Sequence, residues 1–234
     1  MLVSKSEIIT RIRLIIDEVR MNDSDFEGGE DEKDLDTLIE SLSLEALRFI
    51  NINAPHELLA ADAKKSATVT SDGYKTEKGL IEGTVIGVFS GVDNFLRLVC
   101  ARCSHWDKPV YDVIQEGTPA WDKLFNKYLT GTIEDPRVGI GKSAKGATVE
   151  DYDKAEIRLY CVPQVSTEAV TAEVYYMKQP AWDNEDKLRI SYLLQDAFYY
   201  YLAYLVLMAL GDSRAKVAFE QAYPLMGLKE EKND

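Results

Sequence analysis

The chain of 234 residues has few of the side chains that usually bind metals or perform nucleophilic catalysis: two histidines, His56 and His105, and three cysteines. Cys100 and Cys103 form one C-x-x-C pair, whereas Cys161 is single. A closed structural zinc site needs four ligands, which usually come from two such pairs. The cysteines therefore favour free thiols in a reducing compartment, and neither histidine lies in a recognisable catalytic or metal-binding motif.

Basic residues are also scarce, since 27 Lys and Arg stand against 40 Asp and Glu and give a formal net charge of −13. Non-specific binding to nucleic acid needs clustered Lys and Arg, so this balance argues against it, although a local basic face remains possible. The acids in residues 23–36 lack the ligand spacing of an EF-hand and favour a solvated loop. No basic and then apolar leader is visible, so we expect no secretory signal.

A phosphate-binding loop is missing as well. Gly139-Ile-Gly141-Lys142-Ser143 ends like a P-loop, but that motif needs a glycine five residues before its Gly-Lys-Ser. Pro136 stands at that position and has no N–H to offer a phosphate. The segment therefore predicts a polar loop, which we place at residues 139–148.

The stretch of residues 183–223 predicts two helices joined by one tight corner. Asp183 is suited to cap the first helix, Gly211 can take the positive φ needed after its end, and Asp212 and Ser213 can cap the second. Pro224 is expected to stop the second helix. The inward face of the first helix is predicted to begin with Leu188, Ile190, Leu193, Leu194 and Ala197.

Residues 197–210 carry no charge, and this run of about 14 residues is shorter than the roughly 20 needed to cross a bilayer. A helix that is apolar on every side must be covered on every side. Two interpretations follow: a core helix of the chain itself, or a helix covered partly by its own domain and partly by a neighbouring subunit. We expect Tyr200, Tyr204 and Leu207 to lie close to another subunit or to another helix of the bundle.

Helical periodicity also predicts an opening pair of helices, with the second spanning residues 35–53. The middle of the chain has β-branched and aromatic runs typical of strands, at residues 67–70, 83–89, 95–104, 138–140, 155–162 and 169–177. Residues 119–128 predict a short helix, and residues 110–114 are ambiguous. The predicted fold is α+β: a helical bundle formed by the N- and C-terminal helix pairs, with a small, mainly antiparallel β domain inserted between them. The predicted boundaries are residues 1–62, 63–180 and 181–226, with a mobile tail at 227–234.

Several stretches have a pattern found together in one family. Asn94-Phe95-Leu96-Arg97-Leu98-Val99 precedes a Trp-x-basic-Pro-Val turn at residues 106–110, and Ala172-Glu173-Val174-Tyr175-Tyr176 forms a last strand. Residues 193–223 combine an Ala/Tyr/Leu-rich helix, a Gly-Asp-Ser corner and a helix ending in Tyr, and the opening hairpin ends in an Ala-Pro break. In these features the chain resembles the head-to-tail connector adaptors of tailed bacteriophages, also called ring proteins in crAss-like phages and comparable to those of podovirus-type phages. The pattern covers nearly the whole chain and departs at Gly91-Val92-Asp93, where many relatives begin the strand with a proline.

The resemblance implies a structural virion protein with no enzymatic activity and no cofactor. Such proteins form a homo-oligomeric ring, usually of twelve copies, beneath the portal protein. The ring extends the DNA channel and presents a platform to the next tail or ring component. DNA passes without sequence-specific binding, and an acidic wall suits that role because repulsion keeps DNA moving. No membrane is involved.

Two other function classes fit the sequence: a tail completion or stopper protein, and a cytosolic oligomeric enzyme or small-molecule binder. A symmetric ring in electron micrographs separates the virion proteins from the enzyme. Binding to portal, as against tail tube, separates an adaptor from a completion protein.

Two weakly apolar segments are predicted to reach neighbouring chains in the particle. Lys142 and Lys145 lie in the glycine-rich loop at residues 139–148, and Leu228 and Lys229 lie in the tail. Such segments bury too little surface to fix themselves, so we expect them to be poorly ordered in an isolated subunit. The resemblance supplies the partner, because adaptor-like rings use such extensions to reach the portal or the next subunit.

We expect three reduced thiols and no bound metal in the purified protein, because the cysteine count is odd and a fourth zinc ligand is missing. Thiol titration of the denatured protein under non-reducing conditions should give three reactive groups per chain. Stoichiometric zinc in elemental analysis would contradict this expectation.

Overall fold

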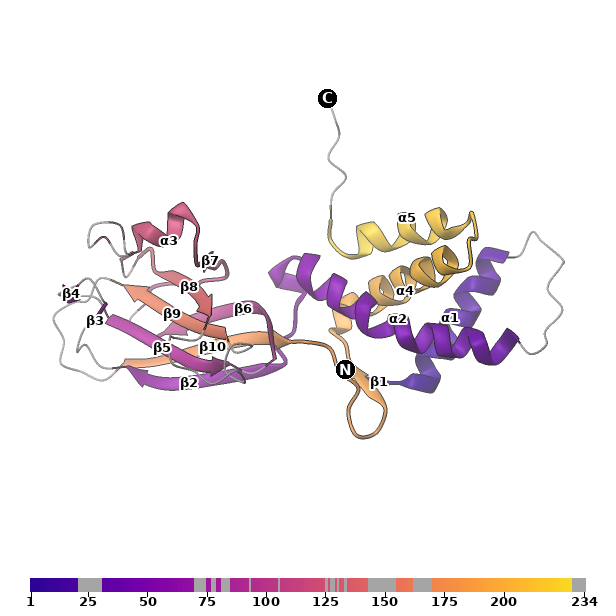
Figure 1. Ribbon diagram of the computed structural model, residues 1–234, viewed down its shortest axis with the longest axis horizontal. Helices are drawn as coiled ribbons and strands as arrows, with labels where there is room; N and C mark the ends of the chain where they lie inside the picture. Colours follow the sequence, from indigo (N-terminus) through magenta and orange to yellow (C-terminus); the bar gives the residue numbers. More distant parts are fainter. Residues whose placement is uncertain are drawn as a thin grey trace, which may run out of the picture. The chain divides into compact units, whose positions relative to one another are not determined.

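The computed structural model describes residues 1–20, 31–69, 75–76, 79–80, 85–92, 94–104, 106–124, 126, 129, 131–132, 134–142, 155–161 and 170–228. It combines α-helices with small sheets that are antiparallel apart from one short pairing, which confirms the predicted α+β class (Figure 1). The chain divides into two compact units: a helical unit of residues 1–60 and 179–234, and a β unit of residues 61–178.

The helical unit contains the two ends of the chain. Its elements are β1 (Leu2–Ser4), α1 (Lys5–Arg20), α2 (Asp31–Asn53), η1 (His56–Leu58), β11 (Lys187–Arg189), η3 (Tyr192–Leu194), α4 (Gln195–Ala209) and α5 (Ala215–Leu225). The Ser4 hydroxyl accepts a hydrogen bond from the Glu7 backbone N–H at 3.3 Å at the start of α1, as a capping residue does. Ile8, Ile12 and Ile15 recur at helical spacing and are fully buried. The helix predicted at residues 35–53 ends at Asn53, as expected before an Ala-Pro step.

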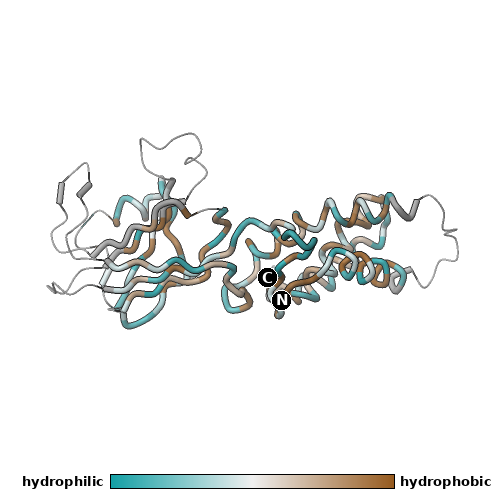
Figure 2. Tube along the Cα trace, turned by 90° about the horizontal axis from the view of Figure 1, so that it is seen from below, coloured by the Kyte–Doolittle hydropathy of each residue, from teal (hydrophilic) through white to brown (hydrophobic). Residues whose placement is uncertain are grey.

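Helix α4 is the central element of this unit and contacts α1, α2 and α5 (Figure 1). Its buried side chains are those of Ala197, Phe198, Tyr199, Tyr201, Leu202, Ala203, Val206 and Leu207. Hydrophobic positions recur along the helices of the unit, as their brown segments show (Figure 2). Most of the uncharged run is therefore covered by helices of the same chain.

The first closing helix begins at Gln195 with Leu194 as its N-cap, eleven residues after the predicted cap Asp183. The Asp183 carboxylate accepts hydrogen bonds from the backbone N–H groups of Glu185 at 2.9 Å and Lys187 at 2.8 Å. Asp186 takes a positive φ of 55°, the chain reverses, and β11 pairs antiparallel with β1. The prediction was wrong because an aspartate that bonds its own following backbone favours a turn as readily as a helix cap.

This turn also changes which side chains face inward. Leu188, Ile190, Leu194 and Ala197 are buried as expected, but Leu193 is 59% exposed because it lies on η3 and not on a regular α-helix. The corner after α4 follows the prediction at Gly211, which has a φ of 70°. The predicted caps Asp212 and Ser213 are wrong, because the residue that precedes α5 is Arg214 and no side chain caps this helix. The Asp212 carboxylate accepts a hydrogen bond from the Arg214 backbone N–H at 2.9 Å, just before α5. Pro224 lies within the last turn of α5 and not beyond its end.

Within its described residues, the β unit contains two larger sheets, one two-stranded pair and one short helix. Its elements are β2 (Ala63–Val69), β3 (Lys75–Thr76), β4 (Gly79–Leu80), β5 (Val85–Val92), β6 (Phe95–Cys103), β7 (Ile114–Gln115), α3 (Pro119–Lys123), β8 (Arg137–Lys142), β9 (Ala155–Cys161) and β10 (Val170–Lys178). One sheet has the order β2-β10-β6 and the other β5-β9-β8-β7, while β3 and β4 pair with each other. Side chains of both larger sheets form one core, including Phe89, Leu98, Val138, Ile157 and Val174.

Two predictions for this unit need correction. The strand predicted at residues 138–140 is confirmed and extends to Lys142, so residues 139–142 do not belong to the predicted loop. They pair with β9 as part of β8, from Arg137 opposite Tyr160 to Lys142 opposite Ala155. Residues 143–148 of that predicted loop lie outside the described residues. The short helix starts at Pro119, with the Trp121 N–H bonded to the Thr118 hydroxyl, but it ends at Lys123 and not at residue 128. The ambiguous segment at 110–114 contributes a single bridge from Val110 to Ala101 and then β7, which is parallel to β8.

Replacing Leu207 with Asp should abolish folding of the helical unit or reduce its stability by more than the about 2–5 kcal/mol typical of Leu→Ala, because Leu207 is fully buried in α4. The neighbouring Met208 is 55% exposed, and Met208→Asp should change the free energy of unfolding by about 0.5 kcal/mol or less. Denaturant unfolding of both variants measures the difference. A folded, soluble Leu207→Asp variant of wild-type stability would contradict the central packing of α4.

Candidate interaction surfaces

An aromatic series joins the opening and closing helices of the helical unit. Tyr201 of α4 stacks on Phe49 of α2, with ring centroids 4.4 Å apart and planes 9° from parallel. On the other side, Tyr204 meets Phe219 of α5 at 5.0 Å, and Phe219 meets Tyr223 at 5.7 Å. Such ring contacts add to the burial of apolar area. They therefore link three helices through side chains on α4.

Two tyrosine hydroxyls in this layer have altered acidity. Burial raises the pKa of Tyr201 to about 12, and the neighbouring Tyr204 and Glu45 act in the same direction. Burial also raises the pKa of Tyr199, whose hydroxyl oxygen accepts a hydrogen bond from the Gln195 side-chain amide at 3.3 Å. Burial therefore disfavours the ionised form of both phenols, which suits a packing role.

The three predicted interface residues of α4 lie at different depths. Leu207 is fully buried, Tyr204 is half-buried and contacts α5, and Tyr200 is half-buried. The face of α4 that these residues share is thus partly occupied by α5. Of the two tyrosines, Tyr204 contacts the ring of Phe219, whereas Tyr200 is not part of the aromatic series from Phe49 to Tyr223.

Large apolar side chains are exposed near both ends of α4. Before the helix, Tyr192 is 76% and Leu193 59% exposed, and Leu2 of the paired strand β1 is 56% exposed. At the other end, Met208 is 55% and Leu210 51% exposed. Single exposed apolar residues are ordinary, and here they occur as adjacent or near-adjacent pairs at the two ends of one helix.

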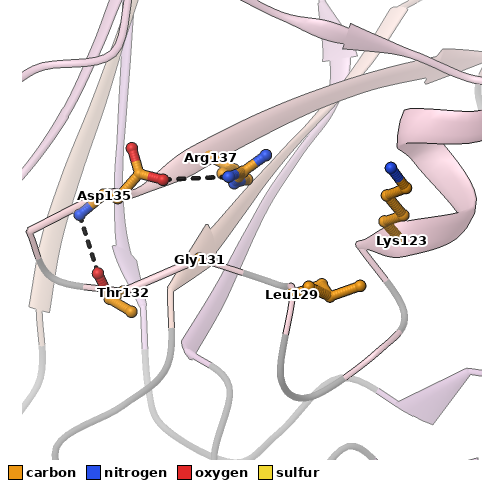
Figure 3. Close-up of a pocket in the computed structure, with 6 residues that line it drawn as sticks. All are labelled: Lys123, Leu129, Gly131, Thr132, Asp135 and Arg137. Atoms are coloured by element: carbon orange, nitrogen blue, oxygen red, sulfur yellow. Dashed lines mark hydrogen bonds and ion pairs between the residues drawn. The ribbon is translucent and has the colours of Figure 1, made fainter.

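A polar pocket of about 290 Å³ opens in the β unit beside α3 (Figure 3). It is lined by Lys123, Leu129, Gly131, Thr132, Asp135 and Arg137. The Asp135 backbone N–H bonds to the Thr132 hydroxyl at 2.9 Å, and the Asp135 carboxylate accepts from the Arg137 guanidinium at 3.1 Å. A second, larger pocket of about 540 Å³ shares Asp135 and Arg137 and adds Lys108, whose ammonium lies 3.6 Å from Asp135.

Charged side chains line both pockets. The side chains of Asp135, Arg137 and Lys108 are about half exposed, and ion pairs at such sites contribute about 0–1 kcal/mol. Neither lining includes a cysteine, serine or histidine, but both include Asp and Lys, which are among the side-chain types that serve as nucleophiles in enzymes. Within the described ranges, no group of three or more His, Cys, Asp or Glu side chains is placed to hold a metal ion. No helix in those ranges is long and apolar enough to cross a membrane.

Two of the remaining four predicted contact residues belong to the described part of the chain. Lys142 ends β8, while Lys145 and Lys229 lie outside the described residues. Leu228 is half-buried and follows Gly227, which has a φ of 75°. A Cβ atom at Gly227 would lie 3.0 Å from the Leu58 side chain. The backbone that follows α5 therefore packs closely against η1.

Sequence reasoning missed the exposed side chains before α4 and the Asp135 pockets. Tyr192 was placed inside a long helix, and Leu193 was assigned to its inward face. The Asp183 turn was the only local signal against that assignment. The pockets had a weak signal in Asp135-Pro136-Arg137, a charged pair around a proline at the start of a strand.

No protein-family model matches the chain, and no curated protein matches it in sequence. Its function is therefore argued from the residues and their arrangement.

The helical unit should lose stability as the pH rises from 10 to about 12. An unfolded tyrosine ionises near 10, whereas the pKa of folded Tyr201 is about 12, so only the unfolded state loses its proton across this window. At a pH of about 11, the wild-type protein should have lost about 1 kcal/mol of its free energy of unfolding through Tyr201, and Tyr201→Phe should not show this loss. Denaturant unfolding measures the difference. The control is Tyr192→Phe at a 76% exposed site, which should keep the wild-type pH dependence. Equal pH dependence of all three proteins would refute the assignment to Tyr201.

Proposed function

We propose that the chain is a structural virion protein, the adaptor subunit of the head-to-tail connector of a tailed bacteriophage. In this role, identical subunits form a ring of about twelve copies beneath the portal and extend the DNA channel. The ring presents its far side to the next tail component. The DNA passes without base-specific contacts, and no cofactor takes part.

The observation that carries the proposal is the division of the chain into two units. The two ends of the chain lie together in the helical unit, and the middle forms a separate β unit. This is the order of elements on which the resemblance to connector adaptors rests. The segments that resemble that family, residues 94–110, 172–176 and 193–223, fall on β6 and its following turn, on β10, and on η3, α4 and α5.

The surface of the helical unit is consistent with a subunit role. The middle of helix α4 is covered by helices of its own unit, so a single chain forms the core of this unit. Its ends present Tyr192, Leu193, Met208 and Leu210 to solvent, and such side chains lose water when a neighbouring copy or a portal packs on them. The acidic balance of −13 supports a wall that repels DNA.

The direct test is binding to the portal protein of the same phage. An adaptor should bind assembled portal and should not bind isolated tail-tube rings, whereas a tail completion protein should show the reverse preference. Co-sedimentation with each assembly measures this difference. A variant with both Tyr192→Ala and Leu193→Ala removes two exposed apolar side chains and should bind portal more weakly. Binding to the tail tube alone would reassign the chain to the completion proteins. Binding to neither assembly, by a folded protein that stays monomeric, would contradict a connector role.

A further inference from the structure

The outward side of the β2-β10-β6 sheet carries a group of charged and aromatic side chains. Ala172, Val174 and Tyr176 of β10 are buried in the core, so the alternating residues Glu173 and Tyr175 point outward. The strand register places Lys64 of β2 opposite Tyr175 and Arg102 of β6 opposite Glu173. We call Lys64, Arg102, Glu173 and Tyr175 the cation face.

Two cations of this face flank one ring. The Lys64 ammonium lies 5.4 Å from the centroid of the Tyr175 ring, and the Arg102 guanidinium lies 5.8 Å from it. The Tyr175 hydroxyl donates to Glu173 at 2.8 Å, and the Lys64 ammonium forms an ion pair with the same carboxylate. Cation–π contacts at these distances hold both basic side chains over the ring.

The cation face has one more positive than negative charge. Lys64 is paired with Glu173, while Arg102 is exposed, lies beyond salt-bridge distance of the carboxylates among the described residues, and attracts the Glu173 carboxylate only from farther away. A guanidinium held over an aromatic ring keeps its planar fork of N–H donors available for a carboxylate. The chemistry of the face therefore fits an acidic partner.

The charges of the chain are divided unequally between its two units. Of the 27 Lys and Arg, 15 lie in the β unit and 12 in the helical unit, while the 40 Asp and Glu divide into 17 and 23. The formal net charge is thus −2 for the β unit and −11 for the helical unit. A copy of this chain consequently offers a strongly acidic unit to the cation face of another copy.

The acids are densest before and at the start of α2. Residues 23–36 hold eight Asp and Glu and one Lys. Some acids of α2 are already neutralised: Asp36 pairs with Arg13 at 2.9 Å, and Glu40 pairs with Lys5 at 3.3 Å. Asp34 is exposed and has no ion-pair partner among the described residues, so it is available to a cation of another molecule.

We propose that the cation face of one copy docks on the acidic start of α2, at Asp34, in a second copy. The two surfaces differ, so the contact is head-to-tail, and a head-to-tail contact closes into a ring when its rotation permits. This inference rests on the proposed ring and adds which surfaces join its subunits. Attraction between a positive and a negative surface also fixes which partner binds and in what orientation.

The test uses charge reversal in the full chain. Arg102→Glu and Asp34→Lys should each weaken self-association by about tenfold or more, measured by sedimentation velocity. The matched control is Lys123→Glu, which makes the same charge change at an exposed site of α3 in the same unit. Wild-type association should also weaken as the salt rises from about 0.1 M to about 1 M, because the screening length falls from about 10 Å to about 3 Å.

Mixing the two variants identifies the pairing and its direction. An Arg102→Glu chain keeps Asp34, and an Asp34→Lys chain keeps the cation face, so the original contact can form between them. The reversed charges, the new Glu at position 102 and the new Lys at position 34, also meet with opposite sign, so the mixture should form rings in which the two variants alternate, while each variant alone should not. The double variant carries both reversed charges in every copy and should recover rings. Thermal unfolding of each variant checks that it is folded. If Arg102→Glu disturbs the sheet, Asp34→Lys still tests the contact, because Asp34 is exposed on a helix of the other unit.

Wild-type rings that persist unchanged in Arg102→Glu would overturn this inference and leave the connector proposal standing. Rings weakened by both single variants but not recovered by the double variant would overturn the pairing with α2. A wild-type chain that stays monomeric alone and with portal would overturn both this inference and the connector proposal. Loss of nucleic-acid binding in Arg102→Glu, with self-association intact, would assign the cation face to a different partner and refute the proposal.

Discussion

The structure of the helical unit depends on covering one uncharged helix. Helix α4 has no charge between Ala197 and Ala209, and water is excluded from most of its length by α1, α2 and α5. The opening helices contribute isoleucine stripes, and the aromatic series from Phe49 through Tyr201 to Phe219 joins them to the closing pair. Because these helices come from both ends of the chain, burying α4 brings the ends together and leaves the middle to form the β unit.

Local patterns predicted the elements that local interactions determine. The Ala-Pro end of α2 and the positive φ of Gly211 each depend on a few neighbouring residues. The errors occurred where distant segments decide between local alternatives. Asp183 can begin a turn or cap a helix, and the turn forms where β11 pairs with β1, which is distant in the sequence. Residues 141–142 extend the predicted strand because β9 pairs with them. The cation face also could not be predicted, since its residues come from three strands and meet only through the register of the sheet.

The two units divide the physical tasks of the proposed subunit. The helical unit is acidic and hides its apolar helix, which suits a soluble subunit of a channel wall. The β unit is close to neutral and displays the cation face. Such a division of charge lets copies of one chain attract each other while the assembly keeps a net negative charge that repels DNA.

The most direct measurement is an electron micrograph of the purified protein combined with its mass in solution. The proposed role predicts ring-shaped particles with rotational symmetry and an open centre, formed alone or on the portal. A ring formed alone should have a mass several times that of the single chain of 26.4 kDa. A folded protein that remains at the mass of a single chain, alone and with portal, would contradict the account.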